Sequence, residues 1–141
     1  MYKKILVERD FEEGRRLLEA LDNAGFPVRA AFWYHLSDSD KWRFIVASPV
    51  VDEKGPKAAY TVIQSVLATL SKTAVGVDNM PRWRLPFGIS LTDITVMSPK
   101  DQLIRLLRKV VRTGPGIHWV EFPQGAINNV FVEDAYIYRI Q

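Results

Sequence analysis

The sequence contains no cysteine, which excludes disulfides, thiol nucleophiles and thiolate metal ligands together. A chain without cysteine fits a reducing compartment. Only two histidines are present, His35 and His118, and they lie far apart in the sequence. A metal site built from both with Glu121 or Asp93 would lack any spacing signature, so we expect no metal.

The motifs that mark common enzyme classes are also missing. No P-loop, no G-x-G-x-x-G dinucleotide fingerprint and no G-x-S-x-G nucleophile elbow occurs. The triplet Asp52-Glu53-Lys54 matches the metal-binding pattern of restriction-type nucleases, but it is flanked by Pro49 and Gly55, which favour a turn. We therefore expect no cofactor, and we expect a protein that is not an enzyme.

Long apolar runs are absent as well. The basic start of the chain is followed by only three apolar residues before Glu8, too few for the apolar core of a signal peptide. No stretch approaches the length of a membrane span. We expect a soluble cytoplasmic protein.

What is present describes one globular domain over residues 1–141. Hydrophobic residues make up 48% and charged residues 25% of the 141 positions, which is typical of a folded chain with a real core. The net charge is +3. This mild excess is compatible with a nucleic-acid partner but does not predict one.

A β-hairpin forms the centre of the predicted fold. Two apolar runs, residues 28–36 and 42–48, flank the polar run 37–41, whose Ser and Asp side chains favour a turn. A five-residue loop would place large side chains on one face, in the pairs Phe32–Val46, Tyr34–Phe44 and Leu36–Trp42. The other face would carry His35 opposite Arg43. Because both faces are partly apolar, we expect the hairpin to be covered on both sides.

Three helices are predicted from apolar periodicity, over about 10–24, 56–71 and 99–112. Further strands are expected at 91–98, 117–122, 127–132 and 135–140. Residues 127–140 fit either one long bent strand or two paired strands, and a single strand of that length would be unusually long. The order of elements predicts an α+β fold with a mixed or mostly antiparallel sheet.

Capping residues and proline mark the predicted helix ends. Asp10, followed by Glu13 three residues later, is typical of a capping box, and Ser98 before Pro99 predicts the start of the last helix. Residues 52–56 are expected to form a loop.

The weak catalytic candidates are His35 and Arg43 on the hairpin. His35 lies near the loop that carries Asp38 and Asp40, so a carboxylate could hold it as a general base. The alternative is a histidine that only hydrogen-bonds at a strand end.

A first set of binding candidates lies in the long segment 73–89, at Arg82, Trp83 and Arg84 between two prolines. Such side chains stack on planar groups or anchor interfaces. The alternative is that Trp83 folds back into the core.

A second set recurs at helical spacing on the last helix: Arg105, Arg108, Lys109 and Arg112. Asp101 is placed to pair with Arg105 only. The stripe predicts contact with phosphates or with an acidic protein. The alternative is that these cations stabilise the helix C-terminus through its dipole.

The middle helix has an almost uncharged outer face, formed by Thr61, Gln64, Ser65, Ala68 and Thr69. Interface cores are depleted of charge, so this face predicts a subunit or partner contact. Our first functional hypothesis is a binding or accessory module that acts through protein contacts and forms homo-oligomers. The alternative is a small phosphate- or nucleic-acid-directed enzyme, or a nucleic-acid binder, that uses the basic stripe; the small net charge does not favour it.

Overall fold

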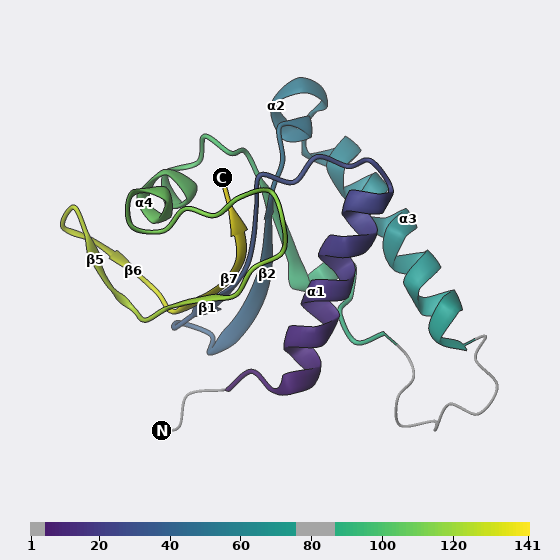
Figure 1. Cartoon of the computed structure of the whole chain (residues 1–141), viewed down its shortest axis with the longest axis horizontal. Coiled ribbons are helices and arrows are strands. Elements are labelled where there is room, and N and C mark those ends of the chain that lie inside the picture. Colours follow the sequence, from purple (N-terminus) through teal and green to yellow (C-terminus); the bar gives the residue numbers. More distant parts are fainter. Residues whose placement is uncertain (1–4, 76–86) are drawn as a thin grey trace.

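The computed structural model describes residues 5–75 and 87–141, without the side chains of 72–75. A five-stranded sheet runs through the middle, with helices on both faces and a separate two-stranded ribbon to one side (Figure 1). The helices are α1 (Glu8–Asn23), α2 (Val50–Lys54), α3 (Pro56–Val75) and α4 (Gln102–Val110). The strands are β1 (Ala30–Leu36), β2 (Lys41–Ala47), β3 (Ile94–Met97), β4 (Val120–Phe122), β5 (Gly125–Ile127), β6 (Val130–Val132) and β7 (Ala135–Ile140).

The strand order β3-β2-β1-β7-β4 makes the sheet mixed, as predicted for this α+β chain. β1 lies in the centre, antiparallel to β2 and β7, while β3 runs parallel to β2. Residues 127–140 do contain two strands, but they do not pair with each other. β6 pairs with β5 in the ribbon, and β7 lies between β1 and β4.

The predicted hairpin register is wrong by one residue. Phe32 pairs with Ile45, Tyr34 with Arg43 and His35 with Trp42. The loop has four residues, and it closes because Asp40 takes a left-handed φ of 50°. Residues of different strands that were predicted to share a face therefore lie on opposite faces, His35 and Arg43 among them.

Two cores lie on the two faces of the sheet. Phe44 and Trp33 point toward α1 and α3, where Leu17 and Ile63 are fully buried. On the other face Phe32 packs with residues of α4 and the ribbon. Figure 1 shows α1 and α3 on one side of the sheet and α4 with the ribbon on the other. The cover on both faces was expected.

Helix ends differ from the predictions. The N-cap of α1 is Val7, and Asp10 is the third helical residue, whose Oδ2 accepts from the Val7 amide at 2.9 Å. The N-cap of α4 is Asp101, whose Oδ1 accepts from the Leu103 amide at 2.9 Å, so Ser98 lies outside the helix. Residues 52–54, predicted to lie in a loop, belong to α2. The predicted strand 91–98 begins with a 3₁₀ turn at Leu91–Asp93.

The parallel strands β2 and β3 end side by side, and each is followed by a Ser-Pro dipeptide, Ser48-Pro49 and Ser98-Pro99. The Ser48 amide donates to the Met97 carbonyl at 3.1 Å. Each serine hydroxyl then accepts from the amide two residues on, at 3.2 Å for Ser48 and 3.0 Å for Ser98. These turns stop both strands at one edge of the sheet and direct the chain into the segments that follow.

The longest helix, α3, has 20 residues and extends past the predicted end at 71. Its outer face is exposed and carries Thr61, Val62, Gln64, Ser65, Ala68 and Thr69. Within residues 5–75 and 87–141, no helix has the length and apolar character needed to cross a membrane.

Candidate functional site

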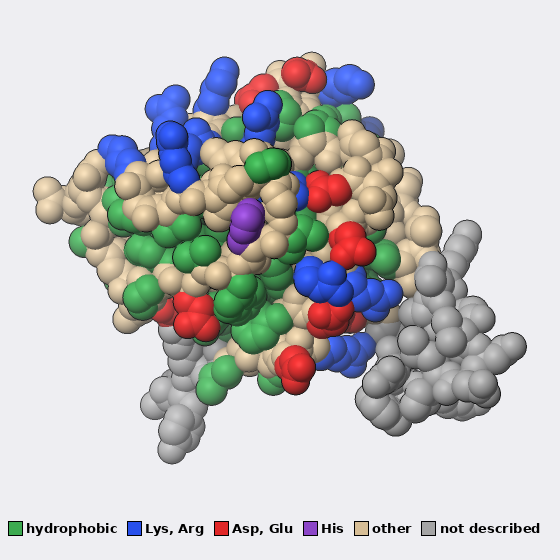
Figure 2. Space-filling view, in the orientation of Figure 1, with side chains coloured by type: hydrophobic (Ala, Val, Ile, Leu, Met, Phe, Trp, Pro, Cys, Tyr) green, Lys and Arg blue, Asp and Glu red, His purple; other side chains and the backbone are tan. Residues whose placement is uncertain are grey.

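The basic face of α4 surrounds an open depression of about 700 Å³. Its lining residues are Arg105, Arg108, Lys109, Val110, Val111 and Arg112, which include four cations and no carboxylate. The opposite side of the helix anchors it, because Ile104 and Leu107 are fully buried. Figure 2 shows Lys and Arg side chains gathered at the upper left, over α4. We call this surface the α4 basic face.

The expected pair between Asp101 and Arg105 does not form, because Asp101 caps the helix instead. Among the described residues, none of the cations of the α4 basic face lies within ion-pair distance of a carboxylate. Arg108 donates from Nη2 to the Pro99 carbonyl at 2.8 Å. Its buried Nε has no hydrogen-bond partner in the described part of the chain.

A second, smaller depression of about 280 Å³ lies beside the first, at the carboxyl ends of β2 and β3. We call it the strand-end depression. It is lined by Arg29, Pro49, Asp52, Pro99, Lys100, Arg108 and Gln141. Arg108 lines both depressions. Asp52 belongs to α2, so the triplet 52–54 is helical and has no strand to support a nuclease-type site.

The structure does not bring His35 and Arg43 together, and this corrects the predicted pair. Arg43 ties β2 to the β3 region, donating to Thr95 Oγ1 at 2.7 Å and to the Thr92 and Ile94 carbonyls at 2.9 Å each. On the opposite face the His35 side chain is only 6% exposed.

Both ring nitrogens of His35 face carboxylates. Nε2 lies 2.8 Å from Asp40 Oδ1, and Nδ1 lies 3.6 Å from Glu133 Oε2. The hydroxyl of Ser37 donates to the other oxygen of Glu133 at 3.0 Å. The ring also packs against Trp42, with centroids 5.0 Å apart. This cluster joins the β1–β2 loop to the connection before β7.

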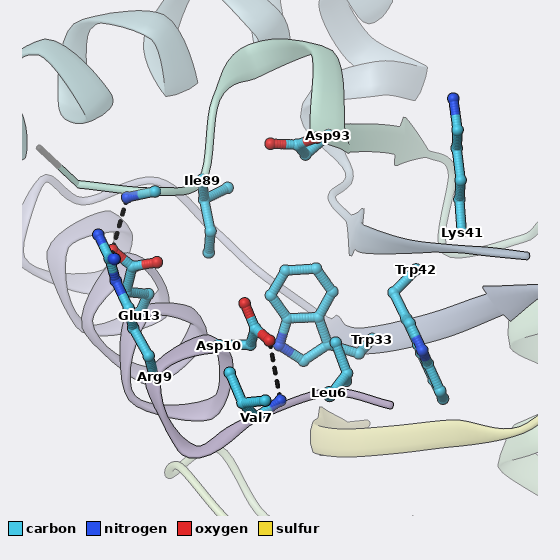
Figure 3. A pocket seen from close by; sticks show the side chains of 11 residues that line it. Leu6, Val7, Arg9, Asp10, Glu13, Trp33, Lys41, Trp42, Ile89 and Asp93 are labelled. Atoms are coloured by element: carbon cyan, nitrogen blue, oxygen red, sulfur yellow. Dashed lines mark hydrogen bonds and ion pairs between the residues drawn. The ribbon is translucent and has the colours of Figure 1, made fainter. Parts of the chain in front are cut away.

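A third hollow, of about 540 Å³, lies between the start of α1 and the first two strands (Figure 3). Trp33 and Trp42 line it, and Lys41 stands at one side. Its carboxylates accept hydrogen bonds from backbone amides. Asp10 accepts from the Val7 amide, and Glu13 accepts from the Gly88 amide at 2.5 Å. These acids therefore organise the hollow's walls.

An aromatic cluster that the sequence pattern did not indicate covers one end of the α1 face. Trp119, 44% exposed, stacks on Tyr136 with ring centroids 5.4 Å apart and meets Phe11 edge-on at 4.5 Å. Tyr138 lies beneath, and burial raises the pKa of its hydroxyl. Phe11 and Tyr136 of this cluster pack against the core on the α1 side of the sheet.

Two further expectations concern metals and the long loop. Within the described residues, no group of three or more His, Asp or Glu side chains is arranged to hold a metal ion. Arg82, Trp83 and Arg84 lie outside the described residues.

The sequence pattern found Arg105, Arg108, Lys109 and Arg112 but missed Arg29 and Lys100. Those two residues lie about seventy positions apart and line the same depression because β2 pairs with both β1 and β3. The repeated Ser-Pro after both strands was the available signal. Scans against protein-family models, curated proteins and solved structures find no significant match to this chain.

Proposed function

We propose that the protein is a binding module, not an enzyme, that holds the phosphate backbone of a nucleic acid on the α4 basic face. The observation that carries this proposal is the depression of about 700 Å³ whose lining contains four cations and no carboxylate. Fixed cations that lack ion-pair partners repel one another, and a bound polyanion relieves that repulsion. Phosphate contacts of this kind supply affinity without sequence specificity.

The helix dipole accounts for only part of this surface. Arg108 and Lys109 lie in the last turn of α4, where a cation is stabilised by about 0.3–1 kcal/mol. Arg105 lies before that turn, and Arg112 follows the C-cap Val111. The dipole therefore gives no reason for a cation at Arg105, whereas a phosphate chain along the helix does.

The test is a triple variant, Arg105→Gln, Lys109→Gln and Arg112→Gln. Arg108 stays intact because its bond to Pro99 is structural. On duplex DNA the slope of log K against log salt should become about two to three units less steep, since each lost contact removes about 0.9. Stability should change little, because exposed cations contribute little to it.

A matched control removes three exposed lysines elsewhere, by Lys41→Gln, Lys54→Gln and Lys57→Gln. It lowers the net charge equally and should leave the salt slope nearly unchanged. If the test and control variants change the salt slope equally, net charge alone explains the binding and the α4 basic face is not the site. If the unaltered protein does not bind nucleic acid, the proposal is overturned.

The α3 outer face supports a second candidate function, self-association. The hydroxyls of Thr61 and Thr69 donate back to the helix's own carbonyls, at 2.9 and 3.1 Å, which lowers the cost of removing them from water. A second copy of this chain is the proposed partner. A cytoplasmic location belongs to the same proposal and is supported by the cysteine-free sequence.

A further inference from the structure

The strand-end depression gathers side chains from three separate segments. Arg29 precedes β1, Lys100 follows β3, and Arg108 comes from α4. Pro49 and Pro99 of the two Ser-Pro turns also line it, at the carboxyl ends of the parallel strands β2 and β3. In open, mostly parallel α/β sheets, ligands bind in the crevice outside the carboxyl ends of the strands, and β2 and β3 form one such parallel pair in this mixed sheet.

The charges around this depression favour an anion. Three cations line it, against the single carboxylate of Asp52. One oxygen of that carboxylate accepts a hydrogen bond from Ser98 Oγ at 3.0 Å, which offsets part of its repulsion of an anion. Within the described residues, neither Arg29 nor Lys100 has an ion-pair partner.

Arg108 is held in place for such a ligand. A hydrogen bond of 2.8 Å from Nη2 to the Pro99 carbonyl fixes the position of the guanidinium. Its Nε is closed to solvent and has no acceptor in the described part of the chain, so a ligand in the depression reaches the other N–H groups of this half-buried side chain. A planar guanidinium donates to phosphate oxygens through such N–H groups.

We propose that the strand-end depression binds a phosphate monoester through Arg29, Lys100 and Arg108. A monoester carries a charge of about −1.5 to −2 at neutral pH and three terminal oxygens, which suits three cations better than the single charge of a diester. The volume of about 280 Å³ suits one phosphoryl group and a small substituent, while the larger depression is open along α4.

One source of this monoester is the phosphorylated end of a nucleic-acid strand, and the other is a small phosphorylated molecule. Arg108 lines both depressions, so a backbone on the α4 basic face leads directly to the strand-end depression. Only the first source rests on the proposed function. The chemistry recognised in the depression is the same for both.

The experiment titrates methyl phosphate and dimethyl phosphate into isotopically labelled protein and follows amide shifts by NMR. Methyl phosphate should bind saturably, and dimethyl phosphate at least about tenfold more weakly. In the variant Arg29→Gln with Lys100→Gln, methyl phosphate affinity should fall about tenfold or more. In the control Arg105→Gln with Arg112→Gln it should stay within about twofold, because those residues line only the other depression.

A conservative variant, Arg29→Lys with Lys100→Arg, should retain most of the affinity, which separates loss of charge from loss of fold. Absence of saturable methyl phosphate binding, or an equal loss in the test and control variants, would overturn the inference.

Oligonucleotides with and without a terminal phosphate identify the source. If the phosphate tightens binding to the unaltered protein but not to Arg29→Gln with Lys100→Gln, the ligand is a strand end. If methyl phosphate binds but terminal phosphorylation has no effect, the monoester site stands and takes a small molecule. If no oligonucleotide binds while methyl phosphate does, the proposed function fails and the monoester site still stands.

Discussion

The indole Nε1 of Trp33 on β1 donates a hydrogen bond of 3.2 Å to the hydroxyl of Tyr138 on β7. That hydroxyl donates in turn to the Phe11 carbonyl on α1, at 2.7 Å. Gly14 allows this approach, because a Cβ there would collide with the Tyr138 hydroxyl and the Trp33 ring. The chain of bonds crosses two strands and a helix, and Tyr138 in its middle is only 2% exposed.

This buried tyrosine predicts a loss of stability in alkali. Burial raises the pKa of Tyr138 above its ordinary value near 10, because the phenolate cannot be solvated there. The unfolded chain loses its proton above about pH 10 while the folded chain keeps it. The stabilisation is therefore complete below pH 10 and is lost as the pH rises toward the folded pKa.

Urea unfolding at pH 8 and at pH 10.5 would measure this loss, with Tyr138→Phe as the variant. The variant should be about 1–3 kcal/mol less stable at pH 8, since Trp33 and Phe11 lose their partner. Its stability should then fall less with pH than that of the unaltered protein. Tyr34→Phe is a useful companion, because burial raises the pKa of Tyr34 also. Parallel pH profiles for Tyr138→Phe and the unaltered protein would contradict the argument.

Phe44 is the second position with a sharp expectation. Its ring is fully buried, edge-on to Trp33 at a centroid distance of 5.1 Å and 6.0 Å from Tyr138. Phe44→Ala should lower the free energy of unfolding by about 3–5 kcal/mol, through lost burial and the cavity left behind. Chemical denaturation measures it, and Phe44→Leu should cost clearly less. A loss below about 1 kcal/mol for the alanine variant would place Phe44 outside the core.

Phe44 was predicted to lie opposite Tyr34 on a buried face, and it is buried although its partner is Trp33. The register is where sequence reasoning failed. Periodicity identifies a buried strand, but it fixes the register only when one face is polar. Here Phe32 and Trp33 are buried on opposite faces, so a slip of one residue exposes nothing apolar. The positive φ of Asp40 decided the loop length, and no apolar pattern reports a backbone dihedral.

The candidate site likewise combines residues that are close in sequence with residues that are far apart in sequence. The spacing of Arg105, Arg108 and Lys109 on one helix is local, and the sequence predicted their common face. The approach of Arg29 and Lys100 depends on which strands are neighbours, and helix or strand periodicity does not contain that pairing. The short helix α2 escaped detection because five residues are too few to show a period.

The last expectation concerns the exposed, uncharged face of α3, which runs from Thr61 to Thr69 and is about 12 Å long. A face of that size is smaller than a standard protein interface, so association through it alone is weak and depends on concentration. The unaltered protein should therefore sediment as a dimer whose population rises with concentration. Thr61→Glu with Gln64→Glu places four carboxylates in the dimer interface, where desolvation and like-charge repulsion both oppose association.

The double variant should sediment as a monomer of unchanged thermal stability, because both positions are exposed in the single chain. A control with the same added charge on other elements, Gln102→Glu with Gln124→Glu, should remain dimeric, since both side chains are exposed away from α3. Comparison of the two variants separates a local effect at α3 from the change in net charge. If the unaltered protein sediments as a monomer at high concentration, self-association through α3 is refuted. The uncharged face of α3 is then an ordinary Ser- and Thr-rich surface.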